Sequence, residues 1–139
     1  LPQGKVVMEL FEELVEPTLL QPTFVCDYPA EAQPLARRHD EDPRLIDAWD
    51  LIIAGVERAT GFTELVDPVV QREVLTQQSL AAAAGDPEAM QLDEDFLRAL
   101  EYGAPPMGGI GIGIDRMVMF FTGASIRETL LFPHLKPEA

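Results

Sequence analysis

The sequence is poor in cysteine, histidine and positive charge. Its single cysteine, Cys26, excludes a disulfide within the chain and fits a reducing, cytosolic compartment. Ten Lys and Arg against 24 Asp and Glu give a formal net charge of −14, which argues against nucleic-acid binding by the general surface. No apolar run approaches the roughly 18 residues that a membrane-spanning helix needs, and no signal-peptide pattern is present. We therefore expect a cytoplasmic protein whose segment here makes no direct membrane contact.

The length of 139 residues allows one domain with a sizeable core, but not two. The chain begins Leu1-Pro2-Gln3-Gly4, without Met, and enters an amphipathic pattern at once. We interpret it as part of a longer protein.

Apolar periodicity and turn residues predict alternating helices and strands. In order, we expect a helix over 4–20, a strand over 21–29, a loop over 30–44, a hairpin over 49–65, helices over 68–85 and 87–102, a strand over 109–114 and a helix that begins near Arg116. Asp67-Pro68 and Asp86-Pro87 each place a capping aspartate before a proline, which predicts a helix start at both positions.

The predicted hairpin turns at Ala54-Gly55. Such a turn pairs Ile53 with Val56, Ile52 with Glu57, and Asp50 with Ala59. Asp50 and Glu57 then share one face as diagonal neighbours, about 7–8 Å apart at the backbone. Two carboxylates so placed can hold a hard cation. A solvated acidic sheet face is the alternative.

The run from Gly109 to Ile114 alternates strictly between glycine and isoleucine. One strand face then carries isoleucines, whereas Gly109, Gly111 and Gly113 leave the other bare, so that something flat or close-fitting can lie on it. We expect Asp115 to cap the next helix, which puts Arg116 in the first turn, where the helix dipole disfavours a cation. An anionic or aromatic ligand beside Arg116 would offset that cost. Close packing with a solvated Arg116 is the alternative.

These glycines carry a family resemblance, because Gly111-Ile112-Gly113-Ile114-Asp115-Arg116 resembles motif 3 of class II aminoacyl-tRNA synthetases. Gly61-Phe62-Thr63-Glu64-Leu65, followed by Asp67-Pro68, resembles the lysyl enzymes. Aspartyl and asparaginyl enzymes place an arginine near the position of Glu64, whereas a carboxylate suits a substrate with a side-chain ammonium. Further segments similar to lysyl-tRNA synthetase are 21–24, 28–29, 34–35, 99–103, 105–106, 125–127 and 131–133, so that the resemblance covers about residues 5–137.

The resemblance implies an α+β fold, the C-terminal part of the class II antiparallel sheet flanked by helices. It implies ATP-dependent activation of L-lysine to lysyl-adenylate with Mg²⁺ as cofactor, transfer to tRNA(Lys) by the full-length protein, and a homodimer of that protein. Motifs 1 and 2 and the anticodon-binding OB-fold have no counterpart here. Residues 1–139 are therefore expected to be one fragment of a catalytic domain, inactive alone.

The resemblance also implies residue roles. Asp50 and Glu57 match the acidic pair that holds Mg²⁺ against the ATP phosphates, and Arg116 matches the catalytic arginine that stacks over adenine and reaches the γ-phosphate. The lysine-binding positions are matched by Thr60, Phe62, Glu64 and Gly111, with Glu64 receiving the ε-ammonium. On an unbroken strand, Thr60, Phe62 and Glu64 face away from Asp50 and Glu57, so we expect a bulge near Ala59-Thr60-Gly61.

Three departures from the lysyl pattern bear on the final lysine acceptor. Thr60 replaces an Asn, Val56 an Arg and Gln33 a Ser. Val56-Glu57 and Thr60 resemble actinobacterial branches, which include the synthetase domain fused to a membrane lysyl-phosphatidylglycerol synthase. Transfer to tRNA, to a protein as in elongation-factor-modifying paralogues, or to lipid by way of tRNA therefore remain open, as does a non-catalytic binding module.

Overall fold

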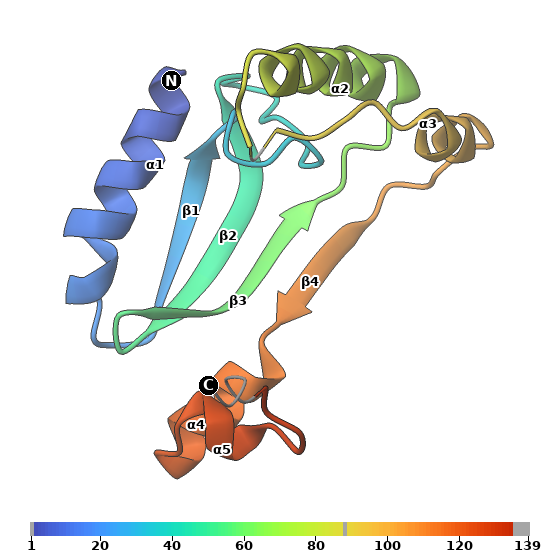
Figure 1. Cartoon of the computed structure of the whole chain (residues 1–139). Coiled ribbons are helices and arrows are strands. Elements are labelled where there is room, and N and C mark those ends of the chain that lie inside the picture. The colour runs from blue at the N-terminus through green and yellow to red at the C-terminus, as the bar shows by residue number, and fades with distance from the viewer. Residues whose placement is uncertain (1, 88, 135–139) are drawn as a thin grey trace.

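The computed structural model describes residues 2–87 and 89–134, and its centre is a four-stranded antiparallel sheet of order β1-β2-β3-β4 (Figure 1). The strands are β1 (Thr23–Pro29), β2 (Leu45–Ile53), β3 (Val56–Thr63) and β4 (Gly108–Ile112). The helices are α1 (Gln3–Leu14), the 3₁₀ turn η1 (Glu16–Thr18), α2 (Pro68–Ala83), α3 (Glu94–Glu101), α4 (Ile114–Thr122) and α5 (Ile126–Thr129). The expected α+β fold is confirmed. Residues 1, 88 and 135–139 of the expected 1–139 domain lie outside the described residues. Of these, residues 88 and 135–137 belong to the stretch that carries the family resemblance.

The helices lie beside the sheet and near both of its ends. Figure 1 shows α1 running beside β1 and β2, α2 and α3 near one end of the sheet, and α4 and α5 beyond the other end. Tyr28 and Ile46 are buried in the sheet, and Met8 of α1 and Phe62 of β3 pack against them. The same sheet face therefore carries the core beneath α1 and, further along, the open strand surface of β3 and β4.

The hairpin forms around the predicted turn, but its register is shifted by one residue. Ile53 pairs with Val56 and Ile52 with Glu57, as expected, but the predicted pairing of Asp50 with Ala59 is wrong because Asp50 pairs with Thr60. The extra residue is Arg58, which makes a β-bulge just before the predicted position. Arg58 is anchored to α4 by a hydrogen bond to a backbone carbonyl, and this contact fixes the bulge there.

Gly61 does not form the bulge near which it was predicted to lie, and its structural role is to accommodate Trp49. It lies opposite Trp49, and a Cβ on Gly61 would stand 2.5 Å from Cζ2 of the Trp49 indole. Because that distance is shorter than any real Cβ contact, only glycine lets the indole lie flat on β3. Gly61 thus makes room for packing on the face opposite Asp50 and Thr60, rather than for the bulge.

Of the two predicted aspartate caps, one is confirmed and one is wrong. The Asp67 carboxylate accepts hydrogen bonds from the N–H groups of Val69 and Val70, and Pro68 is the first residue of α2. No helix begins at Pro87; α3 begins at Glu94, where Asp93 is the cap. The described residues between them are held along α2, since Leu92 N–H donates to Ser79 Oγ at 2.6 Å.

The predicted cap of the last long helix is also displaced. Gly113, rather than Asp115, is the N-cap of α4, and Asp115 lies in the first turn. The Gly113 N–H donates to the Arg58 carbonyl at 3.1 Å, which ends the sheet pairing and starts the helix at the same residue. Arg116 still falls in the first turn, as predicted.

Candidate active site

The bulge at Arg58 brings the predicted site residues to one face of the sheet. Thr60 lies opposite Asp50 on one side and opposite Gly111 on the other, and Phe62 lies opposite Gly109. Residues that face each other across a ladder project to the same side. Beyond the bulge Glu57 is paired with Ile52, which shares a face with Asp50 because the two are two residues apart on β2. The expectation that a bulge unites these positions is therefore correct.

Arg116 closes the α4 end of this face. Its Nη1 donates to the Glu57 carbonyl at 3.0 Å and lies 3.4 Å from the Glu57 carboxylate Oε1. Half of each side chain remains exposed, 51% for Arg116 and 43% for Glu57, so that both can still meet a ligand. The Glu57 carboxylate offsets part of the unfavourable position of Arg116 at a helix N-terminus.

Glu57 sits in an electrostatically unfavourable place for an anion. Burial raises the pKa of Glu57, the Asp50 carboxylate raises it further, and the Arg116 guanidinium opposes both. Burial also raises the pKa of Tyr28, and Asp50 adds to that rise. The buried Tyr28 hydroxyl faces Asp50 without a hydrogen-bond partner of acceptable geometry among the described residues. A cation between Asp50 and Glu57 would relieve their repulsion.

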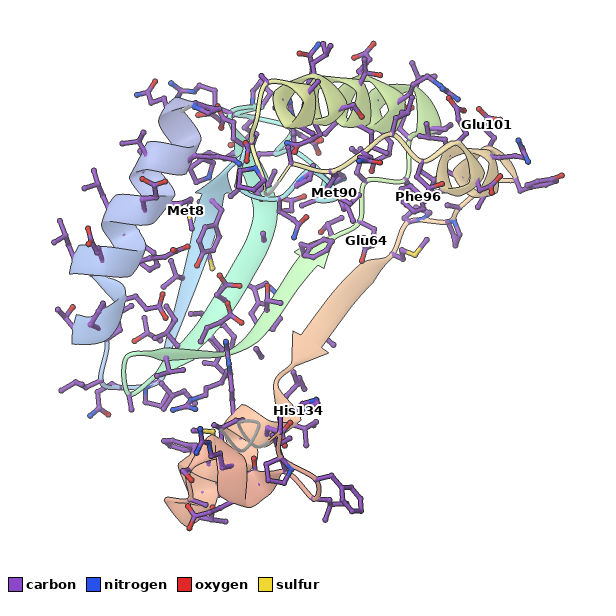
Figure 2. The ribbon with its side chains drawn as sticks, in the orientation of Figure 1. Met8, Glu64, Met90, Phe96, Glu101 and His134 are labelled. Atoms are coloured by element: carbon purple, nitrogen blue, oxygen red, sulfur yellow. The ribbon has the colours of Figure 1, made fainter. Side chains whose placement is uncertain are left out.

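Glu64 lies at the opposite end of β3, beside β4 (Figure 2). Its backbone N–H donates to the Met107 carbonyl at 3.0 Å, and its carboxylate lies over Gly109, where a Cβ would stand 2.5 Å from Oε1. The bare glycine face predicted for β4 is thus filled at Gly109 by Glu64 itself. Gly111 is exposed, and a Cβ there would make only an ordinary contact, 3.4 Å from Thr60 Cγ2.

The site is a strip that follows β3 between two charged ends. The acidic pair and Arg116 lie at the α4 end, Thr60 and Gly111 at the middle, and Phe62 and Glu64 at the other end. At roughly 3.3 Å per strand residue, and allowing for the bulge, the strip is about 20 Å long. An extended amino acid followed by a triphosphate spans a comparable length.

The acidic pair suits a magnesium ion that arrives with its ligand. Within residues 2–87 and 89–134, no three His, Cys, Asp or Glu side chains gather closely enough to hold a metal ion. Mg²⁺ is commonly held by one or two carboxylates, with phosphate oxygens and water completing its octahedron. Asp50 and Glu57 fit that arrangement as the protein's share of the ligands.

Arg58 is a residue of this region that the sequence does not reveal. Within the predicted hairpin it reads as one more alternating polar residue, and no local pattern marks a bulge there. In the folded chain it is 7% exposed and contacts α4 through both its main chain and its guanidinium.

Replacing Glu57 by glutamine is expected to raise the thermal midpoint of the nucleotide-free full-length protein at neutral pH. The pKa of folded Glu57 lies above its unfolded value, so the ionised carboxylate costs stability above that pKa, and the cost vanishes below the unfolded pKa of about 4.3. The gain should therefore shrink as the pH falls toward that value in a series of thermal melts.

Glu94→Gln is the matched control of opposite sign. The hydrogen bonds from Arg72 lower the pKa of Glu94, so its carboxylate stabilises the fold above its unfolded pKa. The control should lower the midpoint at neutral pH. A fall in the midpoint of Glu57→Gln as well would contradict the repulsion inferred between Asp50 and Glu57.

Comparison with known proteins identifies the family of this chain. A family model described as tRNA synthetases class II (D, K and N) matches residues 3–136. The chain therefore belongs to the class II aminoacyl-tRNA synthetase family of the aspartyl, lysyl and asparaginyl group.

Individual relatives of this chain share one printed name. The chain is 58% identical over 134 residues to the lysylphosphatidylglycerol biosynthesis bifunctional protein LysX of Mycobacterium ulcerans, an alignment that covers 96% of this chain and 12% of that protein. It is 55% identical over 135 residues to the protein of the same name from Nocardia farcinica, covering 97% of this chain and 12% of that protein. The chain thus spans about 12% of the length of these curated relatives. In the described part of the chain, no helix has the length and apolar character that crossing a bilayer requires.

Proposed function

We propose that this chain supplies the lysine pocket and part of the ATP site of a lysine–tRNA ligase-type active site, which converts lysine and ATP to lysyl-adenylate and pyrophosphate. The observation that carries the proposal is the order of groups along the strip. A carboxylate stands at one end, an open glycine face at the middle, and an acidic pair with an arginine at the other end.

The Glu64 end suits the lysine side chain. The carboxylate is half-buried at the end of β3 and can accept charge-assisted hydrogen bonds from an ε-ammonium. Phe62 lies on the same face two residues earlier, where its ring can pack along the aliphatic stem. Thr60, opposite Gly111, then lies beside the α-amino and α-carboxylate groups.

The α4 end suits the nucleotide. Arg116 presents an exposed guanidinium that can stack on a base and pair with phosphate oxygens. Asp50 and Glu57 would hold Mg²⁺, which when bound supplies charge neutralisation of the phosphates.

In the proposed reaction an oxygen of the lysine carboxylate forms a bond to the α-phosphorus of ATP. The bond from that phosphorus to the bridging oxygen of pyrophosphate breaks, and that oxygen keeps the electron pair. No proton transfer is required, so the protein acts by alignment of the two substrates and by stabilisation of charge. Glu64 and Arg116, at opposite ends of the strip, fix the alignment.

The proposal concerns a longer protein of which this chain is one part. By resemblance, the arginine for the α-phosphate, the platform beneath adenine and most of a homodimer interface come from segments outside residues 1–139. We therefore propose that the isolated chain catalyses no adenylation, because a triphosphate bound to it lacks half of its cationic partners. We propose the cytoplasm as the compartment of this domain.

The amino-acid specificity of ATP–pyrophosphate exchange tests the proposal, because the family comprises aspartyl, lysyl and asparaginyl members. The full-length protein is assayed with each of the three amino acids. We expect exchange with lysine alone. ATP–pyrophosphate exchange with aspartate or asparagine would show that Glu64 does not select a substrate by its side-chain ammonium.

The names of the relatives favour lipid as the final destination of the lysine, since they are bifunctional proteins of lysylphosphatidylglycerol biosynthesis. We propose that the activated lysine passes through tRNA(Lys) to phosphatidylglycerol. Labelled lysine offered with tRNA, with phosphatidylglycerol vesicles and with both should reach lipid only when tRNA is present. Labelling of a translation factor instead would favour the protein-modifying alternative, and no activation of lysine would favour a binding module.

Replacing Gly109 by alanine is expected to raise the KM for lysine about tenfold without loss of folding. The new Cβ would meet Glu64 Oε1, the far end of a flexible side chain, so the carboxylate moves aside while the sheet is kept. A displaced charge-assisted hydrogen bond accounts for an effect of about that size. Exchange kinetics at varied lysine concentrations measure it.

Gly108→Ala is the matched control, because a Cβ there makes only an ordinary contact, 3.5 Å from the Phe62 carbonyl. Its lysine KM should match that of the wild type. Equal effects of the two substitutions would contradict the contact between Gly109 and Glu64.

A further inference from the structure

Arg58 is a buried arginine without an acidic partner. It is 7% exposed, and no carboxylate in the described part of the chain forms an ion pair with it. Its Nη1 donates to the backbone carbonyl of Arg116 at 2.9 Å, and its guanidinium carbon lies 5.3 Å from the centre of the Phe120 ring. Its Nε is buried with no hydrogen-bond partner. Removing a guanidinium from water is costly, so a position needed only for packing would be better served by an apolar side chain.

The Arg58 carbonyl and guanidinium both form hydrogen bonds with the N-terminal turn of α4. Its carbonyl accepts the N–H of Gly113, the N-cap, and its guanidinium binds the carbonyl of Arg116 three residues further on. In return, Arg116 Nη1 donates to the carbonyl of Glu57, the residue before Arg58. Three hydrogen bonds thus join Glu57 and Arg58 of β3 to the N-terminal turn of α4, and each element both donates and accepts.

This reciprocal bonding also explains why the bulge occurs at Arg58. The bulged residue is free of the ladder between β2 and β3, so its side chain and carbonyl can both serve α4. Phe120, one helical turn beyond Arg116, adds a ring face against which the guanidinium lies. A pocket of about 390 Å³ is lined by Arg58, Arg116 and Phe120 among others, so these contacts border open space.

We propose that Arg58 is a positioning residue that holds the first turn of α4, and with it the Arg116 guanidinium, in register with Glu57 at the nucleotide end of the site. The consequence for ATP rests on the function proposed above, whereas the anchoring of α4 does not. Arg58 acts through Arg116 and touches no substrate. Its effect is therefore confined to the ATP end, because Phe62 and Glu64 lie at the other end of β3.

The test uses the full-length protein with Arg58→Met, which keeps a long side chain without donors, and Arg58→Lys, which keeps a donor for the Arg116 carbonyl. ATP–pyrophosphate exchange gives separate KM values for ATP and lysine. Arg58→Met should raise the ATP KM about tenfold, as expected for loss of a charged hydrogen bond, and leave the lysine KM within about twofold. Arg58→Lys should recover most of the loss.

A double-mutant cycle with Arg116→Ala separates positioning from a general loss of packing. If Arg58 acts through Arg116, adding Arg58→Met to Arg116→Ala should cost little more than Arg116→Ala alone. Multiplicative effects, or an equal rise of both KM values in Arg58→Met, would overturn the proposal.

Hydrogen exchange of the backbone amides of Gly113 and Met117 gives a readout that needs no activity. These amides donate to Arg58 and to Gly113, respectively, and should exchange faster in Arg58→Met than in the wild type, while amides of α2 are unchanged. If the wild type supports no lysine-dependent ATP–pyrophosphate exchange, the proposed function fails. The anchoring by Arg58 is then decided by these amides alone, and unchanged rates at residues 113–117 would overturn it.

Discussion

Replacing Glu64 by glutamine is expected to lower kcat/KM for lysine about 1000-fold, because truncating one partner of a desolvated charge pair costs about 2–5 kcal/mol. The amide keeps the size of the side chain but removes the charge that the ε-ammonium would meet. Since Glu64 has no other charged partner among the described residues, folding should be unaffected. Steady-state exchange with varied lysine measures the loss, and thermal melting checks the fold.

Asp95→Asn is the control for charge removal, since Asp95 lies on α3 with its side chain 90% exposed. It should leave lysine kinetics unchanged. A Glu64→Gln protein with the lysine KM of the wild type would place the ammonium elsewhere and contradict the lysine end of the strip.

Replacing Arg116 by alanine is expected to lower kcat/KM for ATP about 1000-fold, the second large effect that we predict. Arginines that stabilise phosphoryl-transfer transition states contribute effects of that order. The fold should tolerate the change, because a cation in the first helical turn is disfavoured and half of this side chain is exposed. Exchange kinetics at varied MgATP give the value.

Arg98→Ala is the matched control, because Arg98 lies on α3 and its one ion pair among the described residues is with the exposed Asp95. It should leave both KM values as in the wild type. An equal rise of the lysine KM and the ATP KM in Arg116→Ala would contradict a role of Arg116 in ATP binding alone. It would indicate that Arg116 supports the structure of the whole sheet.

The sequence reveals those parts of the fold that local chemistry decides. Ala54-Gly55 turns the hairpin where both residues take positive φ, 56° and 69°, and Asp67-Pro68 caps and starts α2. In each case the required contacts lie within a few residues of the signal. The alternation of Gly109 to Ile114 likewise predicts β4, although the strand ends at Ile112, two residues earlier than expected.

The failed predictions share a cause, which is contact between distant residues. Asp86 lies in a capping pattern, but its carboxylate binds Lys5 at 2.6 Å, 81 residues away, instead of starting a helix. The bulge falls at Arg58 because that side chain binds the carbonyl of Arg116, 58 residues further along the chain. No local pattern contains these partners.

For the candidate site, too, some features could be predicted from the sequence and others depend on contacts between distant residues. The family motifs identify Glu64, Asp50, Glu57 and Arg116 one by one, and the need for a bulge follows from strand alternation. Their order as a strip, and the fit of the Glu64 carboxylate over Gly109, depend on the β3–β4 register, which pairs residues about 50 positions apart. The roles assigned to these residues stay predictions until substrates are tested.

The most direct test of the account is lysine- and Mg²⁺-dependent ATP–pyrophosphate exchange by the full-length protein, run beside its Glu64→Gln and Arg116→Ala variants. We predict exchange with lysine in the wild type and its collapse in both variants, in Glu64→Gln by loss of lysine affinity and in Arg116→Ala by loss of ATP use. Absence of exchange with any amino acid would contradict the adenylation site and leave a synthetase fold that serves binding alone.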